Sequence, residues 1–259
     1  MTPDRPQHPA PVENRLMRLL HAVSRAASPR AALLLVLAVG LLPALALTLV
    51  SAEVYESVTD ADGVAGLDRP ALDYALTLRS PGADAAVTGF TNLAGTIGMP
   101  VIAGVIVLVM CLRWHSWTPL ILTAAAAAGS LLMTVSGKAL IGRTRPDLAD
   151  AVPPYESSAS FPSGHTLNSL VIAGIIAYLV ILHVQTRRAK AAAVLVAAVF
   201  TLAVGLSRVY LGHHWLTDVL VAWTLGAAWL AVVITAHQLL RRLPGRQEAA
   251  PGSPPRRRH

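Results

Sequence analysis

A histidine and an aspartate in the last quarter of the chain have the spacing of a nucleophile and a carboxylate that orients it. His214 and Asp218 lie four residues apart in the stretch GLSRVYLGHHWLTD (205–218), which also contains Arg208. Residues four apart share one face of a helix, so the carboxylate can accept the imidazole Nδ1 proton and leave Nε2 free as a nucleophile. The guanidinium of Arg208 would hold the anion under attack. The pattern predicts nucleophilic chemistry on an anionic group.

Two further cations come earlier in the chain, close to the end of an apolar run. The segment KALIGRTRP (138–146) contains Lys138 and Arg145. A charge at the end of a membrane-spanning helix is costly without a partner, and guanidinium and ammonium groups suit the oxygens of a phosphoryl group. The alternative is that both side chains reach lipid headgroups or pair with Asp147 and Asp150.

The segment SFPSGH (160–165) places small and polar residues at the start of another apolar run. Backbone N–H groups at a helix start, with the Ser163 hydroxyl and the close approach that Gly164 permits, can cradle an anion. His165 can donate a proton to a leaving oxygen. A Pro-Ser-Gly turn also caps many helices, and His214 with Asp218 could form an interfacial helix cap. The three stretches together favour a catalytic site.

The composition indicates an integral membrane protein. Of the 259 residues, 54% are hydrophobic and 14% are charged, and several apolar runs have the ~20 residues that cross a ~30 Å hydrocarbon core. The predicted fold is all-α, a six-transmembrane-helix bundle. The six expected spans are residues 31–52, 91–112, 117–137, 166–184, 191–207 and 215–240. Val50-Ser51-Ala52 loosely resembles a signal-peptidase site, but the apolar run is longer than a signal peptide requires, which favours a retained anchor.

The segments outside the spans give the domain organisation. We expect a cytoplasmic N-terminal tail over 1–30, the six-helix domain over 31–240, and a disordered basic cytoplasmic tail over 241–259. Within the acidic stretch after the first span, Asp68 is expected to cap a short extracytoplasmic amphipathic helix. The residues that fall at helical spacing in it are Leu72, Ala75, Leu76 and Arg79.

Basic residues set the orientation in the membrane. Fifteen of the 21 Lys and Arg residues lie on one side if the N-terminus is inside. The other six are Arg69, Arg79, Lys138, Arg143, Arg145 and Arg208. The positive-inside rule therefore predicts a multi-pass protein of the cell membrane with both termini cytoplasmic. It also predicts that all three motif stretches meet at the extracytoplasmic face.

Charge and cysteine content narrow the classes of function. The net charge of +7 comes mainly from the chain ends and from short connections, which fits membrane orientation and not a nucleic-acid partner. The single cysteine, Cys111, can form no intramolecular disulfide. The sequence offers no convincing His/Asp/Glu set for a metal, so no cofactor is expected, and it does not indicate an oligomeric state.

The three stretches together resemble the signature of the type 2 phosphatidic acid phosphatases, also called lipid phosphate phosphatases. The resemblance rests on Lys-x6-Arg-Pro, then Pro-Ser-Gly-His, then Ser-Arg-x5-His-x3-Asp, and it covers roughly residues 60–240. The matching residues are Lys138, Arg145, Pro146, Pro162, Ser163, Gly164, His165, Ser207, Arg208, His214 and Asp218. The chain departs from the expected pattern at His213, beside the proposed nucleophile.

The resemblance implies a metal-independent hydrolysis in two steps. His214 would attack phosphorus to give a phosphohistidine, Asp218 would orient its ring, and His165 would protonate the leaving group. The residues that would hold the phosphoryl oxygens are Lys138, Arg145, Ser163, Gly164 and Arg208. A site at the membrane boundary suits a lipid phosphate or diphosphate, such as polyprenyl diphosphate, phosphatidic acid or phosphatidylglycerophosphate.

Two other functions fit the same residues. A lipid phosphotransferase would pass the phosphoryl group to an alcohol in place of water. A phospholipid-binding or transport protein would keep the site without turnover, although binding alone does not require a nucleophile and an acid. Vanadate-binding haloperoxidases share the motif residues, but those relatives are soluble and six spans argue against them.

Overall fold

The computed structural model describes residues 29–60 and 62–241, and this part of the chain is helical with no strand. The helices are α2 (Pro29–Asp60), α3 (Asp68–Thr77), α4 (Pro81–Asn92), α5 (Gly98–Trp114), α6 (Thr118–Ile141), α7 (Gly164–His183), α8 (Arg187–Tyr210) and α9 (Leu216–Leu240), with the short 3-10 helices η1 (Gly63–Leu67) and η2 (Leu148–Asp150). The predicted tails, 1–30 and 241–259, lie almost wholly outside the described residues.

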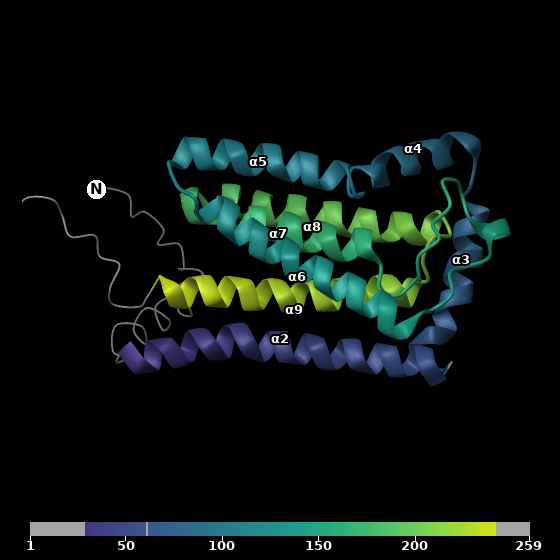
Figure 1. Ribbon diagram of the computed structural model, residues 1–259, viewed down its shortest axis with the longest axis horizontal. Helices are drawn as coiled ribbons and strands as arrows, with labels where there is room; N and C mark the ends of the chain where they lie inside the picture. The colour runs from purple at the N-terminus through teal and green to yellow at the C-terminus, as the bar shows by residue number, and fades with distance from the viewer. Residues whose placement is uncertain (1–28, 61, 242–259) are drawn as a thin grey trace, which may run out of the picture.

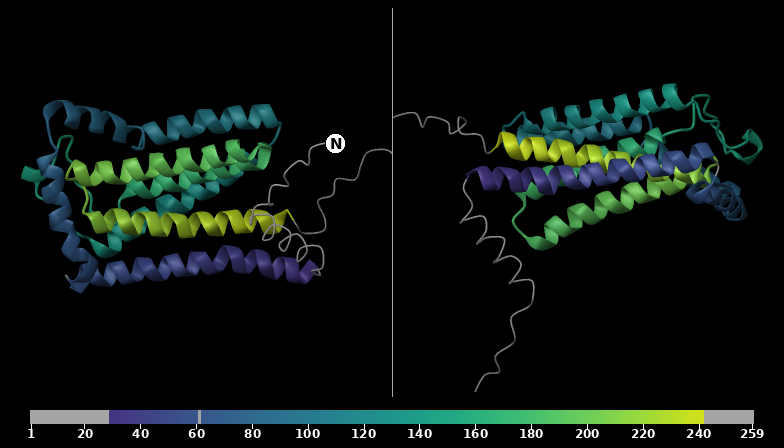
Figure 2. Two further views of the ribbon diagram at one scale, coloured as in Figure 1. Left: turned by 180° about the vertical axis from the view of Figure 1, so that it is seen from behind. Right: turned by 90° about the horizontal axis from the view of Figure 1, so that it is seen from below.

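Six long apolar helices run side by side as one bundle, which confirms the predicted fold class (Figure 1). Five of them, α2, α6, α7, α8 and α9, are long and apolar enough to cross a membrane by length and composition. The views from behind and from below show α2 lying along α9 (Figure 2), and the Ser51 and Thr224 hydroxyls join these helices at 2.7 Å.

Helix α7 is the centre of the bundle and packs against α6, α8 and α9. Its residues Leu167, Val171, Ile175 and Leu179 lie four positions apart and are almost completely buried. Residues at this spacing form one stripe along a helix, so the stripe fixes which face of α7 meets its neighbours. The start of α7, which carries the PSGH motif, is thereby held at one end of the bundle.

The second apolar helix differs from its predicted extent of 91–112. Helix α4 continues to Asn92, the chain turns sharply, and α5 begins only at Gly98 and has 17 residues. A Cβ at position 98 would lie 2.2 Å from the Asn92 carbonyl oxygen, so the tight turn requires a glycine there. Hydropathy alone predicted one continuous span here, because the residues of the turn are themselves apolar or small.

The acidic segment after the first span forms two short helices, α3 and α4, and α3 crosses the end of the bundle (Figure 1). Leu72 and Ala75 are buried, as their spacing predicts. The predicted N-cap role of Asp68 is wrong, because Leu67 occupies the N-cap position and Asp68 is the first helical residue. The Asp68 carboxylate pairs with the partly buried guanidinium of Arg143, which is a stronger partner than a backbone N–H.

Helices α6 and α9 approach each other closely at Gly129. A Cβ at this position would lie 2.1 Å from the Trp229 ring, whose Nε1 donates to the Ala126 carbonyl at 3.0 Å. Nothing lies within 4 Å of the corresponding position at Gly104, on the exposed face of α5. The two glycines therefore offer a matched comparison of packing within helices.

We predict that Gly129→Ala lowers the melting temperature of the detergent-purified protein, because overpacking costs about 1–3 kcal/mol. Gly104→Ala should leave the melting temperature unchanged or raise it slightly, since alanine favours a helix by about 1 kcal/mol over glycine. Thermal unfolding followed by tryptophan fluorescence measures both. Equal effects of the two substitutions would contradict the close packing of α6 on α9.

Candidate active site

The three motif stretches meet at the end of the bundle that α3 crosses. They come from the end of α6 with the α6–α7 connection, from the start of α7, and from the α8–α9 connection. The candidate site residues predicted from the sequence therefore lie close together, although the first and the last of them, Lys138 and Asp218, are 80 residues apart.

His214 and Asp218 are in contact, but they do not share a helix face. His214 lies in the connection before α9, and Asp218 is the third residue of that helix. The distance from His214 Nδ1 to Asp218 Oδ2 is 3.5 Å. The same carboxylate oxygen accepts the Trp215 backbone N–H at 3.0 Å and a short hydrogen bond from the Ser160 hydroxyl. A carboxylate in the first turn points back toward the preceding residues, which brings Asp218 to His214.

The surroundings of the His214 ring assign its proton. Nε2 lies 3.2 Å from Arg145 Nη1, and Nδ1 lies 3.4 Å from the Ser160 hydroxyl. A guanidinium can only donate, so Nε2 is the acceptor and Nδ1 carries the hydrogen that faces Asp218. Burial lowers the pKa of His214 to about 4, with Asp218 opposing this shift and the positive charges of Arg145 and Arg208 adding to it. The ring is therefore neutral near pH 7 and has its lone pair on Nε2.

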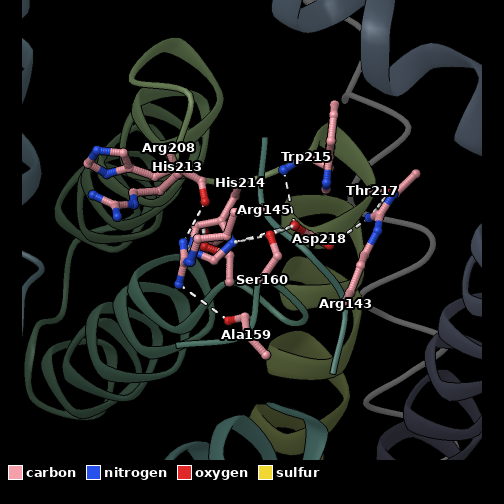
Figure 3. A network of polar contacts seen from close by, with 12 residues as sticks. Arg143, Arg145, Ala159, Ser160, Arg208, His213, His214, Trp215, Thr217 and Asp218 are labelled. Atoms are coloured by element: carbon pink, nitrogen blue, oxygen red, sulfur yellow. Dashed lines mark hydrogen bonds and ion pairs between the residues drawn. The ribbon is translucent and has the colours of Figure 1, made fainter. Parts of the chain in front are cut away.

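Asp218 is held from its other side by Arg143. From the sequence, Arg143 was predicted only to lie on the extracytoplasmic side. Arg143 Nη1 lies 2.7 Å from Asp218 Oδ1 and 2.8 Å from the Thr217 hydroxyl (Figure 3). Its Nη2 lies 2.6 Å from Asp68 Oδ2. Asp68 also accepts the Thr217 backbone N–H at 2.8 Å. The outer helix α3 is thus tied to the carboxylate that orients His214.

Two of the three predicted anion-binding cations converge on a carboxylate that was not predicted, Glu156. Arg145 Nη2 lies 2.7 Å from Glu156 Oε2, and Arg208 Nη2 makes a short ion pair with Oε1. The alternative pairing of Arg145 with Asp147 or Asp150 is not the one observed, and Asp150 pairs with Arg69 at 3.0 Å. Glu156 could not be singled out from the sequence because its partners are 11 and 52 residues away.

Arg208 is 2% exposed, and its Nε has no hydrogen-bond partner within the part of the chain that the structure describes. A buried guanidinium N–H without an acceptor is costly, so this atom marks a position where an anion's oxygen would be stabilised. Lys138 lies on the same side of the site, with Nζ 3.1 Å from the Ser158 hydroxyl and hydrogen-bonded to the Ala159 carbonyl.

The PSGH motif forms the start of α7, as expected, but its serine is used within the protein. Ser163 is fully buried, its N–H donates to the Asp218 carbonyl at 3.3 Å, and its hydroxyl lies 2.9 Å from the Thr166 hydroxyl. Ser163 therefore ties α7 to α9 in this structure. Gly164 begins the helix, and a Cβ there would come within 3.1 Å of Thr134.

His165 lies against the α4–α5 turn, since a Cβ at Gly95 would be 3.4 Å from its Nε2. The ring is close enough to Arg208 and Glu156 to interact with their charges. His165 is only partly buried, unlike His214. The two histidines thus belong to one site and differ in their access to solvent.

His213, the departure from the expected pattern, points away from Asp218. Its Nε2 lies 2.7 Å from the Val152 carbonyl oxygen, so this nitrogen carries the ring proton. Burial is the main cause that lowers the pKa of His213, and the charge of Arg208 adds to it. The neutral ring helps to fix the α6–α7 connection beside the site.

A cavity of about 470 Å³ adjoins the site, lined mostly by the α6–α7 connection together with Gly212 and His213. Among the residues that the structure describes, no group of three or more His, Cys, Asp or Glu side chains lies together as a metal site. The arrangement of a neutral imidazole lone pair beside two guanidinium groups suits attack on the phosphorus of a bound phosphoryl group.

Known proteins with similar sequences and the same fold show which class of protein this chain belongs to. The chain is 35% identical to phosphatidylglycerophosphatase B of Bacillus subtilis over 183 residues, which are 70% of this chain and 88% of the relative. The crystal structure of a transmembrane PAP2-type phosphatidylglycerolphosphate phosphatase from the same species matches with a TM-score of 0.69 and 29% identity, covering 75% of this chain and 96% of the other. Aquifex aeolicus LpxE shares the fold, with a TM-score of 0.51, 22% identity, and coverage of 65% and 94%.

These likenesses describe a multi-pass membrane protein with phosphatase activity. The family model of the PAP2 superfamily matches residues 118–242, which include every motif residue named above. The chain belongs to the PAP2 superfamily and is a phosphatase, as the signature in its sequence led us to expect.

The low pKa of His214 predicts that the ring stays neutral well below pH 6. In the protein labelled with 13C at histidine Cε1, the resonance of His214, assigned by its loss in His214→Asn, should titrate with a midpoint near 4. Acidification from pH 7 to pH 5.5 should leave it almost unshifted. A midpoint at or above the ordinary value of about 6.5 would contradict the assignment of a buried neutral ring.

Arg143 should matter far more for stability than the neighbouring exposed Arg69. Arg143→Ala leaves the buried carboxylates of Asp68 and Asp218 without a cation, which should cost about 3–5 kcal/mol. Arg69→Ala removes only exposed contacts to Asp73 and Asp150 and should change the melting temperature little. Thermal unfolding and phosphatase activity, measured on both variants, check the difference. A stable and active Arg143→Ala protein would show that Asp218 is held by other groups.

Proposed function

We propose that the protein is a lipid phosphate or diphosphate phosphatase that works through a phosphohistidine on His214. The observation that carries the proposal is the position of this ring between Asp218 and Arg145. Its Nδ1 lies 3.5 Å from the carboxylate and its Nε2 lies 3.2 Å from the guanidinium, which places the Nε2 lone pair beside a cation that can hold an anion.

In the first step, His214 Nε2 forms a bond to phosphorus while the bond from phosphorus to the leaving oxygen breaks. The His165 ring, in its protonated form, gives a proton to that oxygen. Asp218 stabilises the positive charge that develops on the His214 ring. The cations Lys138, Arg145 and Arg208 stabilise the additional negative charge on the phosphoryl oxygens.

In the second step, water attacks the phosphohistidine and the nitrogen–phosphorus bond breaks. His165, now neutral, accepts the proton of that water, and the products are inorganic phosphate and neutral His214. Gly164 contributes to phosphoryl binding through its backbone N–H at the start of α7, and Ser163 acts by holding this helix start against α9.

The membrane orientation proposed with this mechanism puts the site on the extracytoplasmic face and both termini in the cytoplasm. Arg113, Arg187, Arg188 and Lys190 all lie at the end of the bundle opposite to the site, in the α5–α6 and α7–α8 connections or next to them (Figure 1). The positive-inside rule assigns such an end to the cytoplasm.

The names of the relatives make phosphatidylglycerophosphate the first substrate to test. Phosphatidic acid and polyprenyl diphosphate are the other two candidates. A lipid phosphotransferase would use the same first step and is separated from a hydrolase by its products. In the presence of an acceptor alcohol, a hydrolase releases inorganic phosphate in proportion to the substrate consumed.

The decisive experiment measures phosphate release by the detergent-purified protein, with EDTA present, from these three lipids and from a soluble phosphomonoester. We expect release from at least one lipid, loss of about 10⁴-fold or more in His214→Ala, and loss of about 10²–10⁴-fold in His165→Ala. The control is His213→Asn, which alters a neighbouring ring that takes no part in the proposed reaction.

The covalent intermediate gives an independent test. With a lipid labelled with 32P in its phosphate, a quench in alkali should trap label on the wild-type protein, and acid should release it as phosphate. His214→Ala should carry no label. Turnover that persists in His214→Ala, or label on another residue, would remove the phosphohistidine from the mechanism.

A further inference from the structure

Glu156 occupies the place between the two guanidinium groups to which the proposed function assigns the phosphoryl oxygens. Its Oε2 lies 2.7 Å from Arg145 Nη2, and its Oε1 is ion-paired with Arg208 Nη2. Each carboxylate oxygen therefore engages a different guanidinium, as two oxygens of a phosphoryl group would. His213 Nδ1 is 3.9 Å from Oε1, but it carries no proton in the neutral ring and donates no hydrogen bond to the carboxylate.

A counter-anion is needed at this place even when no substrate is bound. Arg208 is 2% exposed, and a buried cation without a partner is strongly destabilising. Asp218, the other carboxylate of the site, is occupied by Arg143. Within the described residues, Glu156 is the acidic side chain that pairs with Arg145 and Arg208. It has the charge and the two-oxygen geometry that an empty phosphoryl site requires.

The carboxylate cannot leave this place by taking up a proton at ordinary pH. Burial on its own would raise the pKa of Glu156, but the charges of Arg208 and Arg145 outweigh it and lower the pKa to about 2. A phosphate monoester is also negatively charged near neutral pH. Two anions then compete for the same guanidinium groups, and one must move away before the other can bind.

Glu156 has room to move. It belongs to the non-helical stretch between η2 and α7, its side chain is 28% exposed, and it lines the cavity of about 470 Å³ beside the site. Rotation of the side chain into that cavity would return the carboxylate to water. Of the three histidines near it, His165 and His214 do not line this cavity, whereas His213 does.

We propose that Glu156 is an internal competitor that occupies the phosphoryl site at rest, is displaced by the substrate's phosphoryl group, and returns to help expel inorganic phosphate. This inference rests on the proposed function, since it takes Arg145 and Arg208 as phosphoryl ligands. It makes Glu156 a residue that sets the affinity for substrate and product without taking part in bond making.

The test measures binding of inorganic phosphate and of orthovanadate to the detergent-purified protein by isothermal titration calorimetry. Glu156→Gln removes the charge, and Glu156→Asp keeps the charge but withdraws it by one methylene from the guanidinium groups. Asp150→Asn is the matched control, because it removes one negative charge from the same connection, where Asp150 pairs with Arg69. If Glu156 occupies the site for about 90% of the time, both Glu156 variants should bind about tenfold more tightly than wild type.

Asp150→Asn should bind like the wild type. The Michaelis constant for lipid phosphate and the inhibition constant for inorganic phosphate should fall in parallel with the dissociation constant in both Glu156 variants. If Glu156→Gln is unstable when purified without anions, added phosphate should raise its melting temperature by more than it raises that of the wild type, because phosphate then replaces the missing partner of Arg208.

Two results would overturn the proposal. Weaker phosphate binding in Glu156→Gln would mean that the carboxylate positions the arginines and does not compete with the substrate. Tighter binding in Glu156→Gln with wild-type binding in Glu156→Asp would mean that only the long-range field of the charge acts. Phosphate binding to the two Glu156 variants is measured without turnover. Failure of the proposed hydrolysis would therefore appear separately, as tight phosphate binding without phosphate release from any lipid.

Discussion

Buried charges in this protein are matched by buried charges, and that constraint organises the end of the bundle where the site lies. Two ion-pair triads meet there, Asp68–Arg143–Asp218 and Arg145–Glu156–Arg208. The first has a formal charge of −1 and the second +1. His214 lies between them, with Nδ1 toward the first and Nε2 toward the second. The opposite charges on the two sides of the ring keep the proton on one nitrogen and the lone pair on the other.

The packing of the helices fixes the positions of these triads relative to each other. The buried stripe of α7 fixes the start of that helix, and the Ser163 N–H joins it to the Asp218 carbonyl of α9. Helix α3, which lies outside the family match over 118–242, contributes Asp68 to the first triad. The segment before the matched region therefore helps to hold Asp218 in place, and the position of the proton on the His214 ring depends on it.

The sequence was sufficient for the family and for the class of fold, because motif spacings and the lengths of apolar runs are local features of the chain. His214 and Asp218 are four residues apart, and their contact holds even though the helix begins between them. The roles of Arg143 and Glu156 could not be predicted in the same way, since their partners lie up to 75 residues away and are chosen by the packing of whole helices. Asp68 was assigned to local capping because that role has a local signal, whereas a salt bridge across the bundle has none.

The break between α4 and α5 has a consequence for the surrounding bilayer. Helix α5 has 17 residues and is therefore about 26 Å long, less than the ~30 Å of a hydrocarbon core. Thinning of the bilayer is one of the ways in which a mismatch of this kind is relieved. Thinning would bring the headgroup plane down beside the turn that carries Gly95, which is the turn against which His165 lies. A lipid phosphate, the proposed substrate, would then present its headgroup at that depth while its acyl chains stay in the membrane, and it would reach the site beside α5 without entering water.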